Sequence, residues 1–262
     1  IAAGRRIKTL EANGNDVAIC HSEFLPNAFS FCVFARKYPD ARIFYWAHML
    51  APGLLKGFRG EFTGQYHIPS PSLIHYRLCQ WLYGKLAFSR GIVLANNPFY
   101  MNQLDRMFPS NQKYIFRVYG GVDIPECGDV ANDYDFVWLG RLHVQKGVRE
   151  LIDIAFRVKK SMTSLRIAIV GGGNARIERQ LSRLIQEYGL QENIELRGTI
   201  EGDEKYAYLK ASKVFVMPSY FESFGQVIME AMKCGLPVVA YDLPTYGVFK
   251  RGILKVPILD NQ

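Results

Sequence analysis

The sequence predicts an α/β protein in which parallel sheets are covered by helices. The main observation is that short apolar runs alternate with amphipathic segments through residues 126–262. A length of 262 residues, 49% of them hydrophobic, also suffices to bury one or two substantial cores. The run Val122-Asp123-Ile124-Pro125 predicts a boundary between an N-terminal domain, residues 1–124, and a C-terminal domain, residues 125–262.

The elements of the N-terminal domain are predicted from apolar runs and one aromatic segment. The Asn97-Pro98 turn predicts that a helix begins at Phe99. The other predicted elements are strands at 16–20, 42–47 and 91–95 and an aromatic helix at 75–89.

The C-terminal domain repeats a strand followed by a helix. Apolar side chains at helical spacing predict two amphipathic helices. The first face collects Val148, Leu151, Ile152, Ala155 and Val158, and the second collects Ile177, Leu181, Leu184, Ile185 and Tyr188. Strands are predicted at 136–139, 165–170, 213–217 and 238–240.

A strand, a polar turn and a helix follow one another in the last third of the chain. The apolar run 213–217 is stopped by Pro218 and predicts a buried strand, and the helix begins at Phe224 or Gly225. The free backbone N–H groups of Ser223, Phe224 and Gly225 would therefore lie at a helix N-terminus. Such a terminus binds anions well.

Two glutamates with seven residues between them flank this helix start. Glu222 lies in the turn and Glu230 about two turns further on, roughly 10 Å away at 1.5 Å rise per residue. Either glutamate taken alone would be explained as a solvated surface charge. Glu230, however, lies in the apolar sequence 227–232, where a carboxylate needs a partner because burying an unpaired charge is costly.

This segment resembles the E-x7-E motif of the retaining, nucleotide-sugar-dependent glycosyltransferases of the GT-B fold, a group that includes bacterial glycogen synthases and phosphatidylinositol mannosyltransferases. The resemblance covers most of residues 114–257 in the family's order. The matching segments are 119–123, 136–142, 145–147, 169–173 and 196–200. The resemblance implies two Rossmann-like parallel-sheet domains that face a cleft.

The resemblance also implies roles for individual side chains. The first glutamate of the motif contacts the donor sugar and the second holds the ribose hydroxyls, which suggests these roles for Glu222 and Glu230. Arg141 and Lys146 match the pair that clasps the donor diphosphate, where fixed cations stabilise the charge of the leaving group. His48 matches a histidine that faces the donor sugar.

Further donor contacts are implied for backbone groups. Ser223, Phe224 and Gly225 would hold phosphate and sugar, and groups around Thr199 and Ile200 would hold the base. The turns at Gly140 and Gly171 would also lie beside the donor nucleotide.

Several of these residues have plainer explanations. Arg141 and Lys146 would form an ordinary basic loop if no other motif were present, and His48 would equally suit a strand cap or a hydrogen-bonded core position. The run 171–173 is a poor dinucleotide-binding motif because the third glycine is missing, so a tight strand-to-helix turn is predicted there. His21 is a weaker candidate, and His67, His75 and His143 belong to no convincing motif.

Compared with the family, the sequence lacks expected segments at both ends. The family's first strand with its glycine-rich loop is not visible after Ile1, and further helices would be expected beyond Gln262. We therefore expect an incomplete N-terminal domain.

Charge is placed unevenly along the chain. Residues 1–125 contain 14 Lys and Arg against 7 Asp and Glu, a net charge of +7, whereas residues 126–262 have a net charge of +1. Together with apolar segments such as 54–59, this favours peripheral contact with an anionic membrane or a lipid-phosphate acceptor. A basic surface that serves solubility is the alternative. Nucleic acid is not expected, because no recognised binding module accompanies the charge.

The remaining composition favours a cytoplasmic protein without a metal cofactor. The five cysteines show no metal-ligand spacing and predict free thiols in a reducing compartment. No apolar run reaches the roughly 18 residues of a membrane span. No carboxylate cluster suggests a divalent ion.

The function implied is transfer of a hexose-type sugar, with retention, from a UDP or GDP donor to a hydroxyl of a glycan or lipid-linked acceptor. In the family's front-side mechanism the leaving diphosphate helps to deprotonate that hydroxyl. A nucleotide-sugar epimerase of the same architecture and a non-catalytic nucleotide-sugar-binding or membrane-associated subunit remain alternatives. A nicotinamide-dependent oxidoreductase is more distant.

Overall fold

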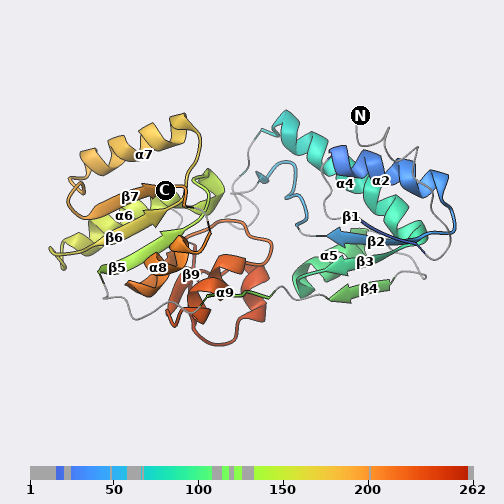
Figure 1. Cartoon of the computed structure of the whole chain (residues 1–262). Helices are drawn as coiled ribbons and strands as arrows, with labels where there is room; N and C mark the ends of the chain where they lie inside the picture. Colours follow the sequence, from blue (N-terminus) through green and yellow to red (C-terminus); the bar gives the residue numbers. More distant parts are fainter. Residues whose placement is uncertain are drawn as a thin grey trace. The chain divides into compact units, whose positions relative to one another are not determined.

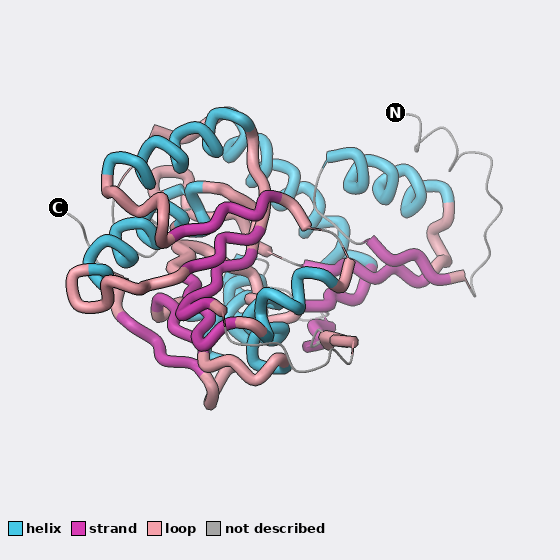
Figure 2. Tube along the Cα trace, turned by 60° about the vertical axis from the view of Figure 1, so that its left-hand side comes forward, coloured by secondary structure: helices cyan, strands magenta, loops and turns pink. Residues whose placement is uncertain are grey.

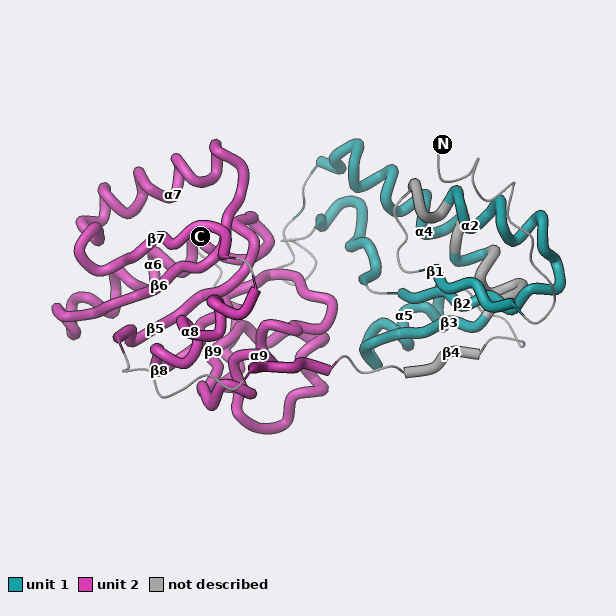
Figure 3. The backbone as a smooth tube through the Cα atoms, in the orientation of Figure 1, with its two compact units in different colours: residues 1–120 teal, residues 121–262 magenta. Residues whose placement is uncertain are grey.

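The structure is a computed structural model of the chain, and Figures 1 and 2 show it from two directions. The structure describes residues 16–20, 25–47, 49–57, 66, 68–107, 114–117, 121–125, 133–200 and 202–258. The chain divides into two compact units, residues 1–120 and 121–262 (Figure 3). This division lies four residues before the boundary expected from the sequence.

The described strands of the first unit form a four-stranded parallel sheet in the order β1-β2-β3-β4. The strands are β1 (Val17–Cys20), β2 (Arg42–Ala47), β3 (Gly91–Ala95) and β4 (Tyr114–Arg117), and the helices are α2 (Leu25–Lys37), α4 (Pro71–Arg90) and α5 (Pro98–Met107). The three predicted strands are confirmed, as are the helices at 75–89 and near residue 99. Helix α2 and strand β4 were not predicted from the sequence.

The described strands of the second unit form a six-stranded parallel sheet in the order β10-β9-β8-β5-β6-β7. The strands are β5 (Tyr134–Leu139), β6 (Ile167–Val170), β7 (Ile194–Gly198), β8 (Ser212–Met217), β9 (Val238–Tyr241) and β10 (Ile253–Val256). The helices are α6 (Val148–Lys159), α7 (Ala175–Glu187), α8 (Glu204–Lys210) and α9 (Gln226–Lys233), with short 3-10 helices η1 (Val144–Lys146) and η2 (Pro244–Val248).

Both predicted amphipathic faces pack against this sheet. Leu151 and Ile152 of α6 and Leu181 and Ile185 of α7 join one buried cluster with the strand residue Ile167. In Figure 1, α7 lies on one side of the sheet, and α8 and α9 lie on the other. The sheet is therefore covered on both faces, as the near-continuous apolar strands predict.

The strand order places the loops after β5 and β8 next to each other. From β5 the chain proceeds outward through β6 and β7, then returns to β8 on the other side of β5. The sheet consequently has its topological switch point between β5 and β8, and open α/β sheets bind ligands at the carboxyl ends of the strands at such a point. The segments predicted to hold the donor follow β5, β6, β7 and β8.

Close backbone contact between neighbouring loops explains the three successive glycines. Gly171 has a φ of 137°, and a Cβ there would lie 1.7 Å from the carbonyl oxygen of Gly140. A Cβ on Gly173 would lie 2.8 Å from the Cβ of Leu142. The Gly171 N–H also donates to the Gly198 oxygen at 2.7 Å. The predicted tight turn is confirmed, and its glycines let the loops after β5, β6 and β7 touch.

We expect Gly171→Ala to lower the free energy of unfolding by more than about 3 kcal/mol, because the new Cβ would force the backbone at Gly140 away. Gly189→Ala is the matched control, since Gly189 has a φ of 62° but open space around it. This control should cost only about 1 kcal/mol, from backbone conformation. Urea unfolding measures both, and equal costs would contradict the close contact.

Candidate functional site

A pocket of about 390 Å³ opens at the carboxyl ends of β5, β6 and β7. Three loops and the first turn of α7 supply its walls. The lining residues are Arg141, Leu142, His143, Gly172, Gly173, Asn174, Ile177 and Thr199. Arg141 and Thr199, two of the predicted donor-binding residues, therefore line the same pocket although 58 positions separate them.

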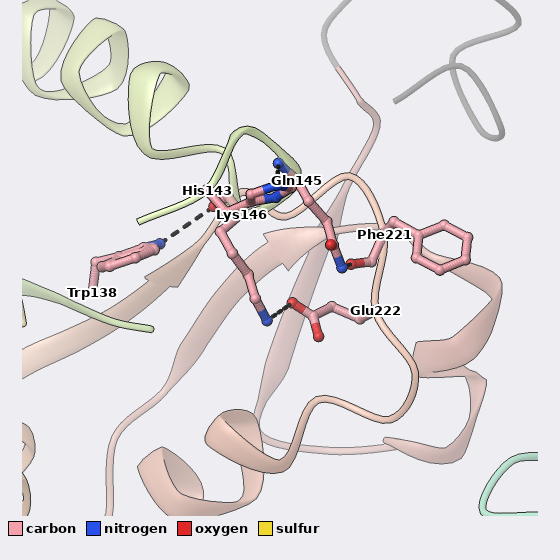
Figure 4. A network of polar contacts seen from close by, with 6 residues as sticks. All are labelled: Trp138, His143, Gln145, Lys146, Phe221 and Glu222. Atoms are coloured by element: carbon pink, nitrogen blue, oxygen red, sulfur yellow. Dashed lines mark hydrogen bonds and ion pairs between the residues drawn. The ribbon is translucent and has the colours of Figure 1, made fainter. Parts of the chain in front are cut away.

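An ion pair joins the loops that follow β5 and β8. Lys146 Nζ lies 2.5 Å from Glu222 Oε1, and the glutamate is only 6% exposed (Figure 4). The residues predicted to bind the diphosphate and the sugar are thus in direct contact. A diphosphate held by Lys146 would share its ammonium group with the Glu222 carboxylate.

Buried backbone contacts hold the same two loops together. The Gln145 side chain donates to the Phe221 carbonyl at 2.6 Å (Figure 4). The Gln145 carbonyl accepts from the Tyr220 N–H at 2.8 Å. The loops also meet at Gly147, where a Cβ would lie 1.8 Å from the Pro218 carbonyl oxygen. These contacts fix the backbone that carries Glu222.

A buried side-chain hydrogen bond adds a further connection. Tyr220 Oη donates to Glu150 Oε1 at 2.7 Å, and both residues are buried. Because Glu150 lies in the first turn of α6, this bond anchors the Glu222 loop to the helix that covers the sheet.

Glu230 has the buried environment and the partner that its apolar neighbours predicted. It is 6% exposed, and its Oε1 accepts from Lys205 Nζ of α8 at 2.9 Å. Burial alone would lower the pKa of Lys205, but the hydrogen bond and charge of Glu230 raise it above its ordinary value. Lys205 was absent from the predicted site, and 25 residues separate it from Glu230.

The helix start differs from its prediction. Helix α9 begins at Gln226, not at Phe224 or Gly225, because Gly225 takes the left-handed conformation (φ 80°, ψ 49°). The N–H groups of Gln226 and Val227 therefore have no partner within the helix, and Gly225 is the cap. Ser223 and Phe224 precede the helix, so their predicted contribution to its N-terminus is wrong.

The remaining predicted site residues are two glycines, Ile200 and two histidines. Gly140 and Gly171 lie at the contact between their loops. Ile200 follows Thr199 and is half-buried. His48 and His21 lie outside the described residues, so the proposed sugar contact of His48 stays a prediction.

His143 was not predicted as a site residue, yet it lines the same pocket as Arg141. Its Nδ1 accepts from the Gln145 N–H at 3.2 Å and caps η1, which places the ring proton of the neutral imidazole on Nε2. Burial, and then the charges of Arg141 and Lys146, lower the pKa of His143 below its ordinary value of 6.5. The cap pattern of a polar residue two positions before an N–H donor was a weak signal for this position.

Comparison with known proteins gives the family of the second unit. Residues 126–249 match the family described as Glycosyl transferases group 1. This part of the chain is a glycosyltransferase group 1 domain. All of its predicted site residues except His48 lie within the matched segment.

Two curated relatives illustrate how far the similarity to this glycosyltransferase domain extends. The phosphatidylinositol N-acetylglucosaminyltransferase gpi3 subunit of Schizosaccharomyces pombe is 29% identical over 117 residues, 44% of this chain and 25% of that protein. An N-acetylgalactosaminyltransferase of Campylobacter jejuni, whose name gives a diphospho-undecaprenol substrate, is 29% identical over 177 residues, 65% of this chain and 46% of that protein. The chain thus spans a quarter to about a half of these relatives.

The fold comparison extends to both units. HepE of Anabaena, solved in complex with UDP and glucose, superposes with a TM-score of 0.71 at 19% identity, over 97% of this chain and 67% of that protein. The GT-B assignment of the α/β fold is confirmed by such neighbours.

The described part of the chain contains neither a metal-binding cluster nor a membrane-spanning helix. Among these residues, no group of three or more His, Cys, Asp or Glu is arranged to hold a metal ion. No described helix is both long enough and apolar enough to span a bilayer.

We expect Lys205→Met to lower the free energy of unfolding by about 2 kcal/mol, because it leaves the buried Glu230 carboxylate without its cation. Adding Glu230→Gln should recover most of this loss, since the amide carries no charge. Lys213→Met is the control, because Lys213 pairs with Asp135 at 2.8 Å but is 58% exposed, and should cost under about 1 kcal/mol. Additive losses in the Lys205 and Glu230 variants, by urea unfolding, would contradict the coupling.

The lowered pKa of His143 predicts a pH-dependent stability. Below an ordinary pKa of 6.5 the unfolded chain binds the proton more tightly than the folded chain, so the free energy of unfolding falls as pH decreases through this value. His143→Asn keeps an acceptor for the Gln145 N–H but has no titrating ring. Urea unfolding across a pH series should show wild type losing stability relative to this variant at acid pH. Parallel curves would contradict the prediction.

Proposed function

We propose that this chain carries the donor site of a glycosyltransferase that moves a hexose-type sugar from a nucleoside diphosphate to an acceptor hydroxyl, with retention of configuration. The observation that supports this best is the ion pair of Lys146 and Glu222, which joins the two loops at the topological switch point. One neighbouring pocket presents Arg141, a cation, beside Thr199. A ligand with a charged centre and polar ends suits this arrangement.

The diphosphate is assigned to the cations. Arg141 offers a planar fork that matches phosphate oxygens, and Lys146 offers a point charge on a flexible chain. The N–H groups at the start of α9 add positive partial charge on the same edge of the sheet. Together these groups would stabilise the charge that the leaving diphosphate gathers in the transition state.

The two ends of the donor are assigned to the glutamates. Glu222 accepts hydrogen bonds from the sugar hydroxyls and Glu230 from the ribose hydroxyls, while Lys205 keeps the second carboxylate in place. Groups around Thr199 and Ile200 hold the base. His48 contributes a further contact to the sugar.

The names of related proteins narrow the substrates of this proposal. The UDP of the HepE complex favours a UDP donor, with GDP as the second choice. The phosphatidylinositol and diphospho-undecaprenol of the relatives' names favour a lipid-linked acceptor over a free glycan. Such an acceptor requires peripheral contact with the cytoplasmic face of a membrane, and we propose that no metal is needed.

Nucleotide binding tests the donor site. Calorimetry with UDP and GDP should show saturable binding of one of them, and Arg141→Ala should weaken it about tenfold or more, because a charge-assisted phosphate contact is lost. Arg141 is exposed, so its replacement should leave the free energy of unfolding within about 0.5 kcal/mol. Arg179→Ala, an exposed arginine on α7, is the matched control.

The ribose role is tested with deoxy analogues of the nucleotide that binds. Wild type should prefer the parent nucleotide over its 2′-deoxy and 3′-deoxy forms, and Glu230→Ala should remove this preference. If Glu230→Ala weakens parent and deoxy nucleotides equally, the glutamate supports the site without touching the ribose. If no nucleotide binds to the folded protein, the donor site itself is refuted.

A further inference from the structure

The outward side of helix α4 is apolar. Ile74, Leu78, Trp81 and Leu82 are each between 45% and 54% exposed. These positions recur at helical spacing and share one stripe with Lys85. An amphipathic helix normally places polar residues on its solvent side, so this stripe reverses the expected pattern.

The opposite side of α4 is already packed. Leu73 and Tyr76 are buried in a cluster with Ala51, and the Gln80 side chain accepts from the Ala51 N–H and donates to the Met49 carbonyl. Tyr76 Oη donates to the same Met49 carbonyl at 3.0 Å. Because these contacts fix how the helix is rotated, the apolar stripe cannot turn inward without breaking them.

The helix that carries the stripe has a net positive charge. Residues 71–90 contain Arg77, Lys85 and Arg90 and no Asp or Glu. The Lys85 ammonium lies 4.1 Å from the centre of the Trp81 ring. A tryptophan beside a lysine is typical of side chains at a membrane–water interface, where the ring enters the headgroup layer and the ammonium faces lipid phosphates.

A neighbouring turn continues this character. Arg77 donates to the carbonyls of Ala51 and Pro52 at 2.9 and 2.7 Å and holds the chain that leads into this turn. Leu54 and Leu55 are exposed in the turn and are followed by Lys56. The apolar and basic surface is therefore built from two segments held together by hydrogen bonds.

We propose that this α4 surface, Ile74, Leu78, Trp81, Leu82 and Lys85 with the turn at 54–56, binds the surface of an anionic membrane. The inference rests on the proposed function for its purpose, delivery of a lipid-linked acceptor, and on the α4 contacts for its location. Bulky apolar side chains enter the headgroup layer, while the cations add attraction to anionic lipids. The absence of acidic residues from 71–90 fits that partner.

Vesicle binding tests the surface. The probes are vesicles of phosphatidylcholine alone and of phosphatidylcholine with about one third phosphatidylglycerol. The protein should sediment with the anionic vesicles, less so at high salt because screening weakens the attraction. Its tryptophan emission should shift to the blue, and Trp81→Phe should remove most of the shift, because Trp138 is buried and Trp46 is half-buried in strand β2.

A matched pair of variants locates the contact. Leu78→Glu places a carboxylate in the stripe and should reduce partitioning onto anionic vesicles about tenfold or more, through lost apolar burial and added repulsion. Leu254→Glu makes the same change at an exposed leucine of the second unit and should leave partitioning unchanged. Both leucines are exposed, so both variants should keep the wild-type thermal melt.

The outcomes separate this inference from the donor site. Equal partitioning of Leu78→Glu and wild type, or equal binding to neutral and anionic vesicles, would overturn it. So would a blue shift that grows with protein concentration in the absence of vesicles, which would assign the surface to a second copy of the chain. Vesicle binding by a protein that binds no UDP or GDP would refute the donor site and leave the surface standing.

Discussion

The contact between the loops after β5 and β8 is the constraint on which the candidate site depends. The strand order makes these loops neighbours, and the hydrogen bonds of Gln145 hold them at a fixed separation. At that separation Lys146 reaches Glu222. The ion pair is therefore a consequence of backbone packing, because the sheet positions the two loops that carry these side chains.

The same packing explains why glycine occurs at two positions of these loops. Gly147 and Gly171 each lie against a carbonyl oxygen of a neighbouring loop, at 1.8 and 1.7 Å from where a Cβ would stand. Removing these side chains allows the loops to converge, and convergence brings Arg141, His143 and Thr199 to one pocket. A glycine here serves the site indirectly, by letting the loops that carry the polar residues meet.

Much of the fold could be predicted from the sequence, because parallel strands buried on both faces leave strong apolar signals. The burial of Glu230 was predictable for the same reason, from its apolar neighbours. Its partner was not, because Lys205 lies on another helix and meets Glu230 only through the order of β7, α8 and β8. The start of α9 was misplaced because Phe224 is apolar and buried, whereas the left-handed Gly225 decides where the helix begins.

The ion pair also constrains how a diphosphate sugar would enter. Because Lys146 already contacts Glu222, a phosphate group that approaches the ammonium competes with a carboxylate for the same donors. Glu222 is 6% exposed, so a sugar that supplied hydroxyl donors to its carboxylate would offset part of the lost attraction of the ammonium. A free phosphate offers no such donors. We therefore expect phosphate binding at Lys146 and sugar binding at Glu222 to be coupled.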